Sequence, residues 1–218
     1  MIGAIIGDIV GSRFEWNNYR KKDFILFTED CFATDDSIMS LAIAGAVLQH
    51  QTEAVDLSKA AVFWMQKVGR PYPHCGFGGN FYHWIYSDDP KPYNSFGNGA
   101  AMRVSACGLS AKTLEAALQM STAVTAVTHN HPEGIKGANA TTAAIFLAKS
   151  GASKDAIRTA ISVGGDSDTL AAITGSIAEA YYGVPKELYD TAVTYLDEPL
   201  KQILFAFESV FGSNLQAE

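Results

Sequence analysis

Residues 37–50 read SIMSLAIAGAVLQH, and this stretch decides the fold class. Its apolar residues recur at helical spacing, with Ile38, Leu41, Ala42 and Leu48 on one stripe, which predicts an amphipathic helix. Similar spacing recurs over residues 57–68, 114–127, 141–149, 154–163, 170–182, 186–196 and 200–211. No run of residues has the alternation that predicts a strand. The sequence therefore predicts an all-α fold.

Glycine and proline mark the ends of these helices. Gly69 and Gly212 each follow an apolar periodic segment, as helix-stop residues do. Pro132 stands where proline is favoured, at the first position of a helix. The least helical stretch, residues 69–99, leaves room for one short helix over residues 81–86. Without an internal repeat, low-complexity tract or linker, residues 1–218 are expected to form a single domain.

Composition narrows the class of protein. Of the 218 residues, 48% are apolar and 18% are charged, and 16 Lys and Arg against 23 Asp and Glu give a net charge of −7. That apolar fraction supports a substantial core. Without a basic face, neither a nucleic acid nor an anionic membrane is expected as a partner.

Cysteine usage and the N-terminal residues indicate a cytoplasmic protein. Cys31, Cys75 and Cys107 are odd in number and form no CxxC pair, so neither a disulfide framework nor a structural zinc site is expected. Residues 1–10 lack the positive charge of a secretory signal, and residues 37–49, the longest uncharged apolar run, are too short to span a bilayer.

Two acidic loops each precede an apolar helix. The first loop is Thr34-Asp35-Asp36-Ser37. Two interpretations are open for it: a Thr or Asp that caps the helix, or a binding site for a hard cation. In the second, capping explains the last two residues of Gly164-Gly165-Asp166-Ser167-Asp168-Thr169 but not Asp166 or the paired glycines. Together the two loops offer enough carboxylate and hydroxyl oxygens for two divalent metals.

A third polar group lies near the N-terminus. On a helix, Asp8, Ser12 and Glu15 would share one face. Such a polar stripe is most often a solvent-exposed face, whereas Gly7 and Gly11 at the same spacing indicate close approach by another backbone or a ligand.

Two further segments carry weaker signals. The Gly-x-Gly core of residues 94–103 follows no predicted strand, so it does not predict a Rossmann site. His129 and His131 lie two residues apart, not in an HExxH motif, so a zinc hydrolase is not expected. Capping by His131, or a packed surface histidine, is the simpler interpretation.

Taken in order, five motifs resemble the ADP-ribosylglycohydrolase family. They are GDIVGSRFE, TDDS, NSFGNGAAMR, THNHPEGIKGA and GGDSDTLAAITGSIAEAYYG, spread over residues 7–183. The resemblance implies a compact orthogonal bundle of helices with two Mg²⁺ or Mn²⁺ at the base of a cleft. The metal ligands it implies are Thr34, Asp35, Asp36, Asp166, Asp168 and Thr169.

The resemblance also implies roles for other residues. Glu15 matches a glutamate that faces the metals and the scissile bond, and is the expected general acid/base, with Asp35 as the alternative base. The ADP-ribose pocket is implied at Ser95, Gly97, Asn98, Gly99 and His129, where backbone N–H groups of residues 97–99 would cradle the diphosphate. Asp8 and His131 are expected to support the site.

The implied activity is metal-dependent hydrolysis of the glycosidic bond in an ADP-ribosylated protein or a small ADP-ribose conjugate, such as an acylated ADP-ribose. A non-catalytic alternative, an ADP-ribose-binding or crystallin-like structural member of the family, remains open. The segment between Lys149 and Gly164 favours this alternative, because it is shorter than in most relatives and would leave part of the cleft without a wall.

Overall fold

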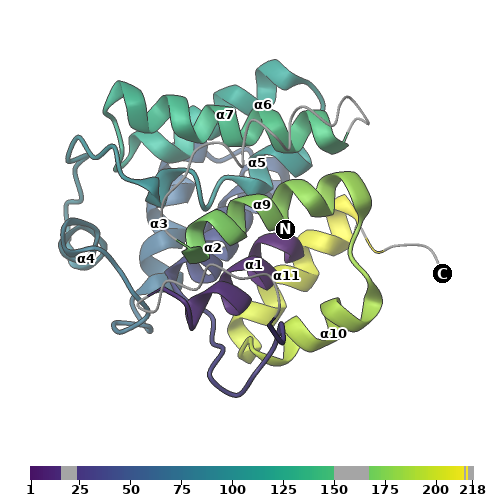
Figure 1. Cartoon of the computed structure of the whole chain (residues 1–218). Coiled ribbons are helices and arrows are strands. Elements are labelled where there is room, and N and C mark those ends of the chain that lie inside the picture. The colour runs from purple at the N-terminus through teal and green to yellow at the C-terminus, as the bar shows by residue number, and fades with distance from the viewer. Residues whose placement is uncertain (16–23, 150–166, 214, 216–218) are drawn as a thin grey trace.

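The computed structural model describes residues 1–15, 24–149, 167–213 and 215, and in them it shows helices and no strand (Figure 1). The all-α prediction is therefore confirmed. No helix in these ranges is long and apolar enough to cross a membrane. The helices are α1 (Ile2–Ser12), α2 (Asp35–Glu53), α3 (Leu57–Gly69), α4 (Gly79–Tyr86), the 3₁₀ turn η1 (Asn98–Ala100), α5 (Ser105–Ser110), α6 (Leu114–Ala126), α7 (Pro132–Lys149), α9 (Ser167–Tyr182), α10 (Lys186–Thr194) and α11 (Glu198–Phe211).

Helix α2 runs through the centre of the core. It packs against α1, α3, α5, α9 and α11, and its residues 36–47 are all buried. The prediction of an amphipathic helix is wrong here, because neighbours cover every face. Small residues allow that close packing: a Cβ atom at Gly45 would lie 2.5 Å from the Trp64 ring.

Helices α1 and α9 cross with their backbones in contact (Figure 1). A Cβ atom at Gly175 would lie 1.9 Å from the carbonyl oxygen of Gly3, so neither helix tolerates a side chain at this crossing. The Gly3 N–H donates to the Glu179 carboxylate at 2.9 Å. This contact holds α1 against α9. The cavity described below is reached by Glu15, three residues after α1, and by Thr169 in the first turn of α9.

Most predicted helix limits hold within a few residues. Helix α3 ends at Gly69, α7 begins at Pro132, and Gly212 follows α11 with a positive φ of 83°. The segment predicted over residues 141–149 is only the second half of α7, and the helix predicted over residues 154–163 lies outside the described residues. The short η1 and α5 were not predicted, since neither is long enough to show a periodic pattern.

Candidate active site

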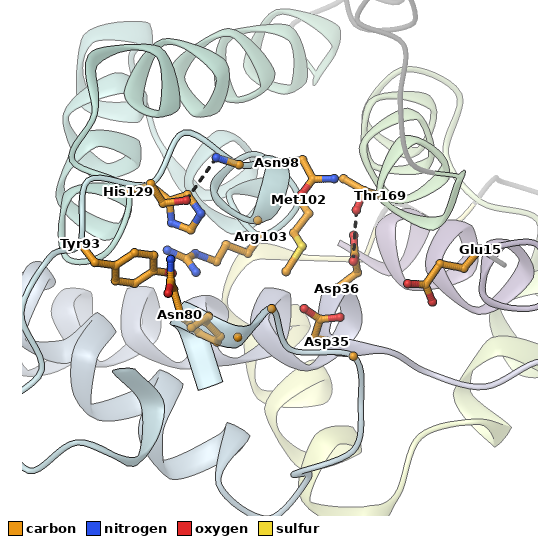
Figure 2. A pocket seen from close by; sticks show the side chains of 17 residues that line it. Glu15, Asp35, Asp36, Asn80, Tyr93, Asn98, Met102, Arg103, His129 and Thr169 are labelled. Carbon is orange, nitrogen blue, oxygen red and sulfur yellow. Dashed lines mark hydrogen bonds between the residues drawn. The ribbon is translucent and has the colours of Figure 1, made fainter. Parts of the chain in front are cut away.

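One cavity of about 350 Å³ brings together most of the residues that the sequence singles out (Figure 2). Those that line it are Glu15, Asp35, Asp36, Ser95, Gly97, Asn98, Gly99, His129 and Thr169. Thr34 is buried beside it and does not line it. Asp166 lies outside the described residues, and the side chain of Asp168, in the first turn of α9, is likewise not described.

Asp8 anchors the start of α2. Its buried carboxylate accepts hydrogen bonds from the backbone N–H of Thr34 (2.9 Å) and of Ser37 (3.1 Å), and from both hydroxyl groups, at 2.6 Å for Thr34. Thr34 in turn caps the helix, accepting from the Asp36 N–H at 3.2 Å. Burial raises the pKa of Asp8, and the donated hydrogen bonds oppose that rise. The expectation that Asp8 supports the site fits this contact, whereas a solvent-exposed face for Asp8 is wrong.

The two acidic residues that follow this cap lie at the cavity. Asp36 is buried, and its Oδ2 atom accepts a long hydrogen bond of 3.4 Å from the Thr169 hydroxyl of α9. The half-buried Asp35 is held by its own N–H, which donates to the carbonyl of Cys75 at 3.0 Å. Burial and the Asp35 charge raise the pKa of the Cys75 thiol to about 12, so this thiol stays protonated. Residues of α2 and α9, distant in sequence, thus present oxygen atoms to one space.

The loop before α4 fits closely against Asp35. Gly76 has a φ of +116°, and a Cβ atom there would lie 2.8 Å from Asp35 Oδ1. A side chain at position 76 would therefore be strained by its backbone and would press on the carboxylate.

Glu15 reaches the cavity from a bend and not from a helix. Helix α1 ends at Ser12, and Glu15 follows three residues later, half-buried. The prediction that Asp8, Ser12 and Glu15 share one helix face is therefore wrong for Glu15. Figure 2 places its carboxylate beyond Asp35 and Asp36, at the end of the cavity away from His129.

The loop over residues 93–99, the glycine loop, is held against the segment that follows α6. Tyr93 N–H donates to the Thr128 carbonyl at 3.1 Å, and Asn94 N–H donates to Asn130 Oδ1 at 2.7 Å. Within the loop, the Gly97 N–H donates to Ser95 Oγ at 3.2 Å, so one of the N–H groups expected to cradle a diphosphate is turned toward its own loop.

Residues 131–134 support the loop from behind. The prediction that His131 caps a helix is confirmed, since its Nδ1 atom accepts from the Glu133 N–H at 3.1 Å. Its ring packs against Phe96, with ring centroids 5.3 Å apart. A Cβ atom at Gly134 would lie 2.8 Å from the Ser95 carbonyl oxygen, so α7 and the glycine loop meet backbone to backbone.

Arg103 is a buried cation in the cavity wall to which the sequence analysis assigned no role. It is only 1% exposed, donates to Thr128 Oγ1 at 2.7 Å and lies over the Phe81 ring, with Cζ 5.6 Å from the centroid. Burial lowers its pKa to about 10, so it stays charged at neutral pH. Burial and this charge lower the pKa of His129 to about 3, so that histidine is neutral.

Other residues of the wall were also missed. They are Gly76, Gly78, Gly79, Asn80, Phe81, Tyr93 and Met102. A signal existed for Arg103, which is the only charged residue of residues 92–111. Met102 stands directly before Arg103, after η1, in one of the five motifs. The remaining residues come from α4 and its flanking loops, and only long-range packing brings these to the cavity.

The cavity has two ends of opposite character (Figure 2). Three carboxylates, Glu15, Asp35 and Asp36, gather at one end, whereas Arg103 and neutral His129 lie toward the other. Among the described residues, no group of three or more His, Cys, Asp or Glu side chains could hold a metal ion. Two of the four aspartates that the resemblance implies as metal ligands, Asp166 and Asp168, have side chains outside the described part of the structure.

Similarity to known proteins identifies the family and the fold of the chain. The family described as ADP-ribosylglycohydrolase matches residues 1–156 and 142–205. Among 42 solved chains that match is an ADP-ribosylglycohydrolase-related protein complex, 18% identical with a TM-score of 0.65, where the match covers 95% of each chain. At that identity the likeness shows the fold alone. No curated protein matches the sequence. Since the family match covers most of its length, the chain belongs to the ADP-ribosylglycohydrolase family.

Proposed function

We propose that this protein hydrolyses the glycosidic bond at C1 of the distal ribose in ADP-ribosylated proteins or small ADP-ribose conjugates. The observation that carries the proposal is the polarity of the cavity, with carboxylates at one end and Arg103 and His129 toward the other. An ADP-ribosyl group needs such a division, because its diphosphate is anionic and its reacting ribose is not. The family to which the chain belongs supports the same reaction.

The acidic end fits a pair of divalent cations. Asp35, Asp36 and Thr169 offer oxygen atoms alone, the donors that Mg²⁺ and Mn²⁺ prefer. We include Thr34, buried beside the cavity, as a further ligand, because its hydroxyl donates to Asp8 and accepts from the Asp36 N–H, which leaves one lone pair on Oγ1. We include Asp166 and Asp168 as further ligands. Two Mg²⁺ or Mn²⁺, when bound, would activate a water and grip the ribose hydroxyls.

Side chains of the cavity would transfer the proton and stabilise the charge that develops on the sugar. We assign Glu15 as general acid/base because it lines the acidic end from outside the two metal loops. Asp35 is the alternative base. Carboxylates at this end also favour the positive charge that develops on the sugar ring in glycoside hydrolysis. Ser95, Gly97, Asn98 and Gly99 would line the binding site for the rest of the substrate.

Turnover of three substrates with different linkages tests the proposal. ADP-ribosyl-arginine, an ADP-ribosyl-serine peptide and O-acetyl-ADP-ribose are each incubated with the protein and Mg²⁺, and released ADP-ribose is quantified. We expect release from at least one, its loss in EDTA and its loss in Asp35→Asn. Asp89→Asn is the matched control, since the exposed Asp89 carboxylate pairs with Lys91 on the surface and does not line the cavity.

Two results would count against the proposal. ADP-ribose binding without turnover of any substrate would favour the non-catalytic member of the family. Full turnover by Asp35→Asn would remove the metal loop of α2 from the reaction.

A single domain over residues 1–218, a cytoplasmic location and the absence of nucleic-acid partners stay predictions.

A further inference from the structure

Three buried polar side chains form a chain of hydrogen bonds that ends at the cavity. Arg103 Nη2 donates to Thr128 Oγ1 at 2.7 Å, and Thr128 Oγ1 lies 2.7 Å from His129 Nδ1. Thr128 is fully buried, and His129 is 5% exposed. Because both contacts are short, the position of the single hydroxyl proton decides which nitrogen of His129 carries a proton.

The hydroxyl proton has two possible acceptors. One is His129 Nδ1 at 2.7 Å, and the other is the carbonyl oxygen of Thr125 at 3.4 Å. That carbonyl already accepts from two backbone N–H groups, of Thr128 at 3.1 Å and of His129 at 2.9 Å, so both of its lone pairs are engaged. Arginine donates only, and it therefore occupies a lone pair of the hydroxyl. The hydroxyl proton accordingly points to Nδ1.

With Nδ1 as acceptor, the imidazole proton of neutral His129 lies on Nε2. This atom faces the glycine loop in the cavity: a Cβ atom at Gly99 would lie 3.5 Å from it, and one at Gly97 would lie 3.9 Å from it. All hydrogen bonds of the chain then run in one direction, from Arg103 to the cavity, and hydrogen bonds in such a series strengthen one another. The last donor, Nε2–H, faces any ligand held against the loop.

The charged surroundings of His129 favour an anionic ligand. In the part of the chain that the structure describes, Arg103 and the ring of Tyr93, 5.8 Å from the imidazole centroid, are the titratable groups that face it. Burial raises the pKa of Tyr93, so at neutral pH the tyrosine carries no charge. In the described part of the chain no carboxylate forms a salt bridge with Arg103, although the Asp35 charge acts on it from the acidic end, and its Nε–H has no hydrogen-bond partner. This end of the cavity thus presents a net positive charge and a fixed donor.

We propose that Arg103 and Thr128 are positioning residues that fix His129 as the Nε2–H tautomer, so that it donates to a phosphate oxygen of the substrate. The choice of phosphate rests on the proposed function, whereas the tautomer does not. Phosphate oxygens are acceptors only, and a histidine locked as a donor never presents a lone pair to them.

The tautomer is measured in the free protein by long-range ¹H–¹⁵N NMR of the imidazole rings, with His129→Gln used for assignment. We expect a bare Nδ1 and a protonated Nε2 between pH 5 and 8. Thr128→Val removes the hydroxyl at nearly constant volume, and we expect it to yield a mixture of tautomers. Thr128→Ser keeps the hydroxyl and serves as the matched control, with an unchanged spectrum. A wild-type His129 protonated on Nδ1 would overturn the proposal even if Thr128→Val failed to fold.

Binding separates the ligand from the tautomer. Calorimetry with ADP-ribose and ADP is expected to show affinity reduced on the order of tenfold in Thr128→Val, as for the loss of one good hydrogen bond, but not in Thr128→Ser. The affinity for adenosine, which lacks phosphate, is expected to be the same in Thr128→Val as in the wild type. Equal losses for adenosine and ADP would overturn the phosphate assignment. If wild-type protein bound neither nucleotide, this assignment and the proposed function would both fail, whereas an Nδ1–H tautomer with intact ADP-ribose binding would overturn this inference alone.

Discussion

Replacing Asp8 tests whether the acidic end of the cavity is held from behind. In Asp8→Ala, the backbone N–H groups of Thr34 and Ser37 lose their carboxylate acceptor in a buried place, while the two hydroxyls are able to rotate. Leaving a buried donor unsatisfied costs about 1–3 kcal/mol, so the two N–H groups imply about 2–6 kcal/mol of lost stability. In a chain of this length, that lowers the melting temperature on the order of 10 °C.

Asp8→Asn is the more informative variant, because it changes charge and keeps shape. An amide oxygen in place of Oδ2 still accepts from both N–H groups, and the amide NH₂ then faces the Thr34 hydroxyl where Oδ1 accepted from it. Exchanging a charged for a neutral acceptor costs about 1 kcal/mol per bond. The NH₂ group donates to Thr34 Oγ1 and occupies the lone pair that a cation would use. We therefore expect a folded protein with weakened Mg²⁺ binding.

Thermal melts followed by circular dichroism, with and without Mg²⁺, measure both effects. The control is Asp56→Asn, since Asp56 only caps α3 through the Lys59 N–H and asparagine caps a helix equally well. A melting temperature of Asp8→Ala equal to that of the control would refute the anchoring role. An unchanged Mg²⁺ shift in Asp8→Asn would refute the argument about the lone pair.

Four other changes test separate parts of the site. Glu15→Gln is expected to keep ADP-ribose binding and to lower turnover about 10²–10⁴-fold, as loss of a general acid/base does, and an unaltered rate would move that role to Asp35. Mg²⁺ at a hundredfold excess over Kd is expected to stabilise the wild-type fold by about 2.7 kcal/mol, reversibly with EDTA; Asp35→Asn should lose this shift, and a wild type that melts identically in Mg²⁺ and in EDTA would contradict the metal site. His129 has a folded pKa of about 3 against an ordinary value of 6.5, so below pH 6.5 the unfolded chain binds a proton that the folded chain does not. The stability of the fold therefore decreases as the pH is lowered below 6.5. Between pH 7 and pH 5 the wild type is expected to lose about 2 kcal/mol relative to His129→Gln in urea unfolding, and parallel pH curves would contradict this value. Gly175→Ala brings a methyl group within 1.9 Å of the Gly3 carbonyl, so we expect a loss of both stability and activity, and normal turnover would show that the contact of α1 with α9 does not set the site.

The helices were predictable where sequence alone determines them. Ends that depend on backbone chemistry, such as Gly69, Pro132 and the Thr34 cap, lie where the local residues indicate. The environment of α2 was not predictable, because burial on all sides depends on which helices pack around it. The limits of the short α5 likewise depend on packing, since six residues are too few to show a period.

The site residues likewise divide into those that were predictable from local sequence and those that depend on long-range packing. Residues that stand in motifs, such as Asp35, Asp36 and His129, were found because adjacent polar residues before a helix are visible in a sequence. The burial of Asp8 was open at the sequence level, because a polar residue on an apolar helix is most often exposed. Its role depends on Thr34, the cap of α2, which lies 26 residues away in sequence. Arg103 stands out in the sequence as the only charged residue of residues 92–111, but its burial in the cavity wall depends on the same long-range information.

The two ends of the cavity are built on one principle with opposite signs. At the acidic end, the buried acceptor Asp8 takes the hydroxyl protons of Thr34 and Ser37, so lone pairs are what remain for a cation. At the other end, the buried donor Arg103 occupies a lone pair of Thr128, so the hydroxyl proton moves outward and Nε2–H remains for an anion. A hydroxyl group serves either purpose, and the charge behind it decides which. Weakening the influence of that charge is therefore expected to weaken the preference of the end that it supports. The Asp8→Asn melt measures this at the acidic end, and Thr128→Val, which breaks the link between Arg103 and His129, measures it at the other.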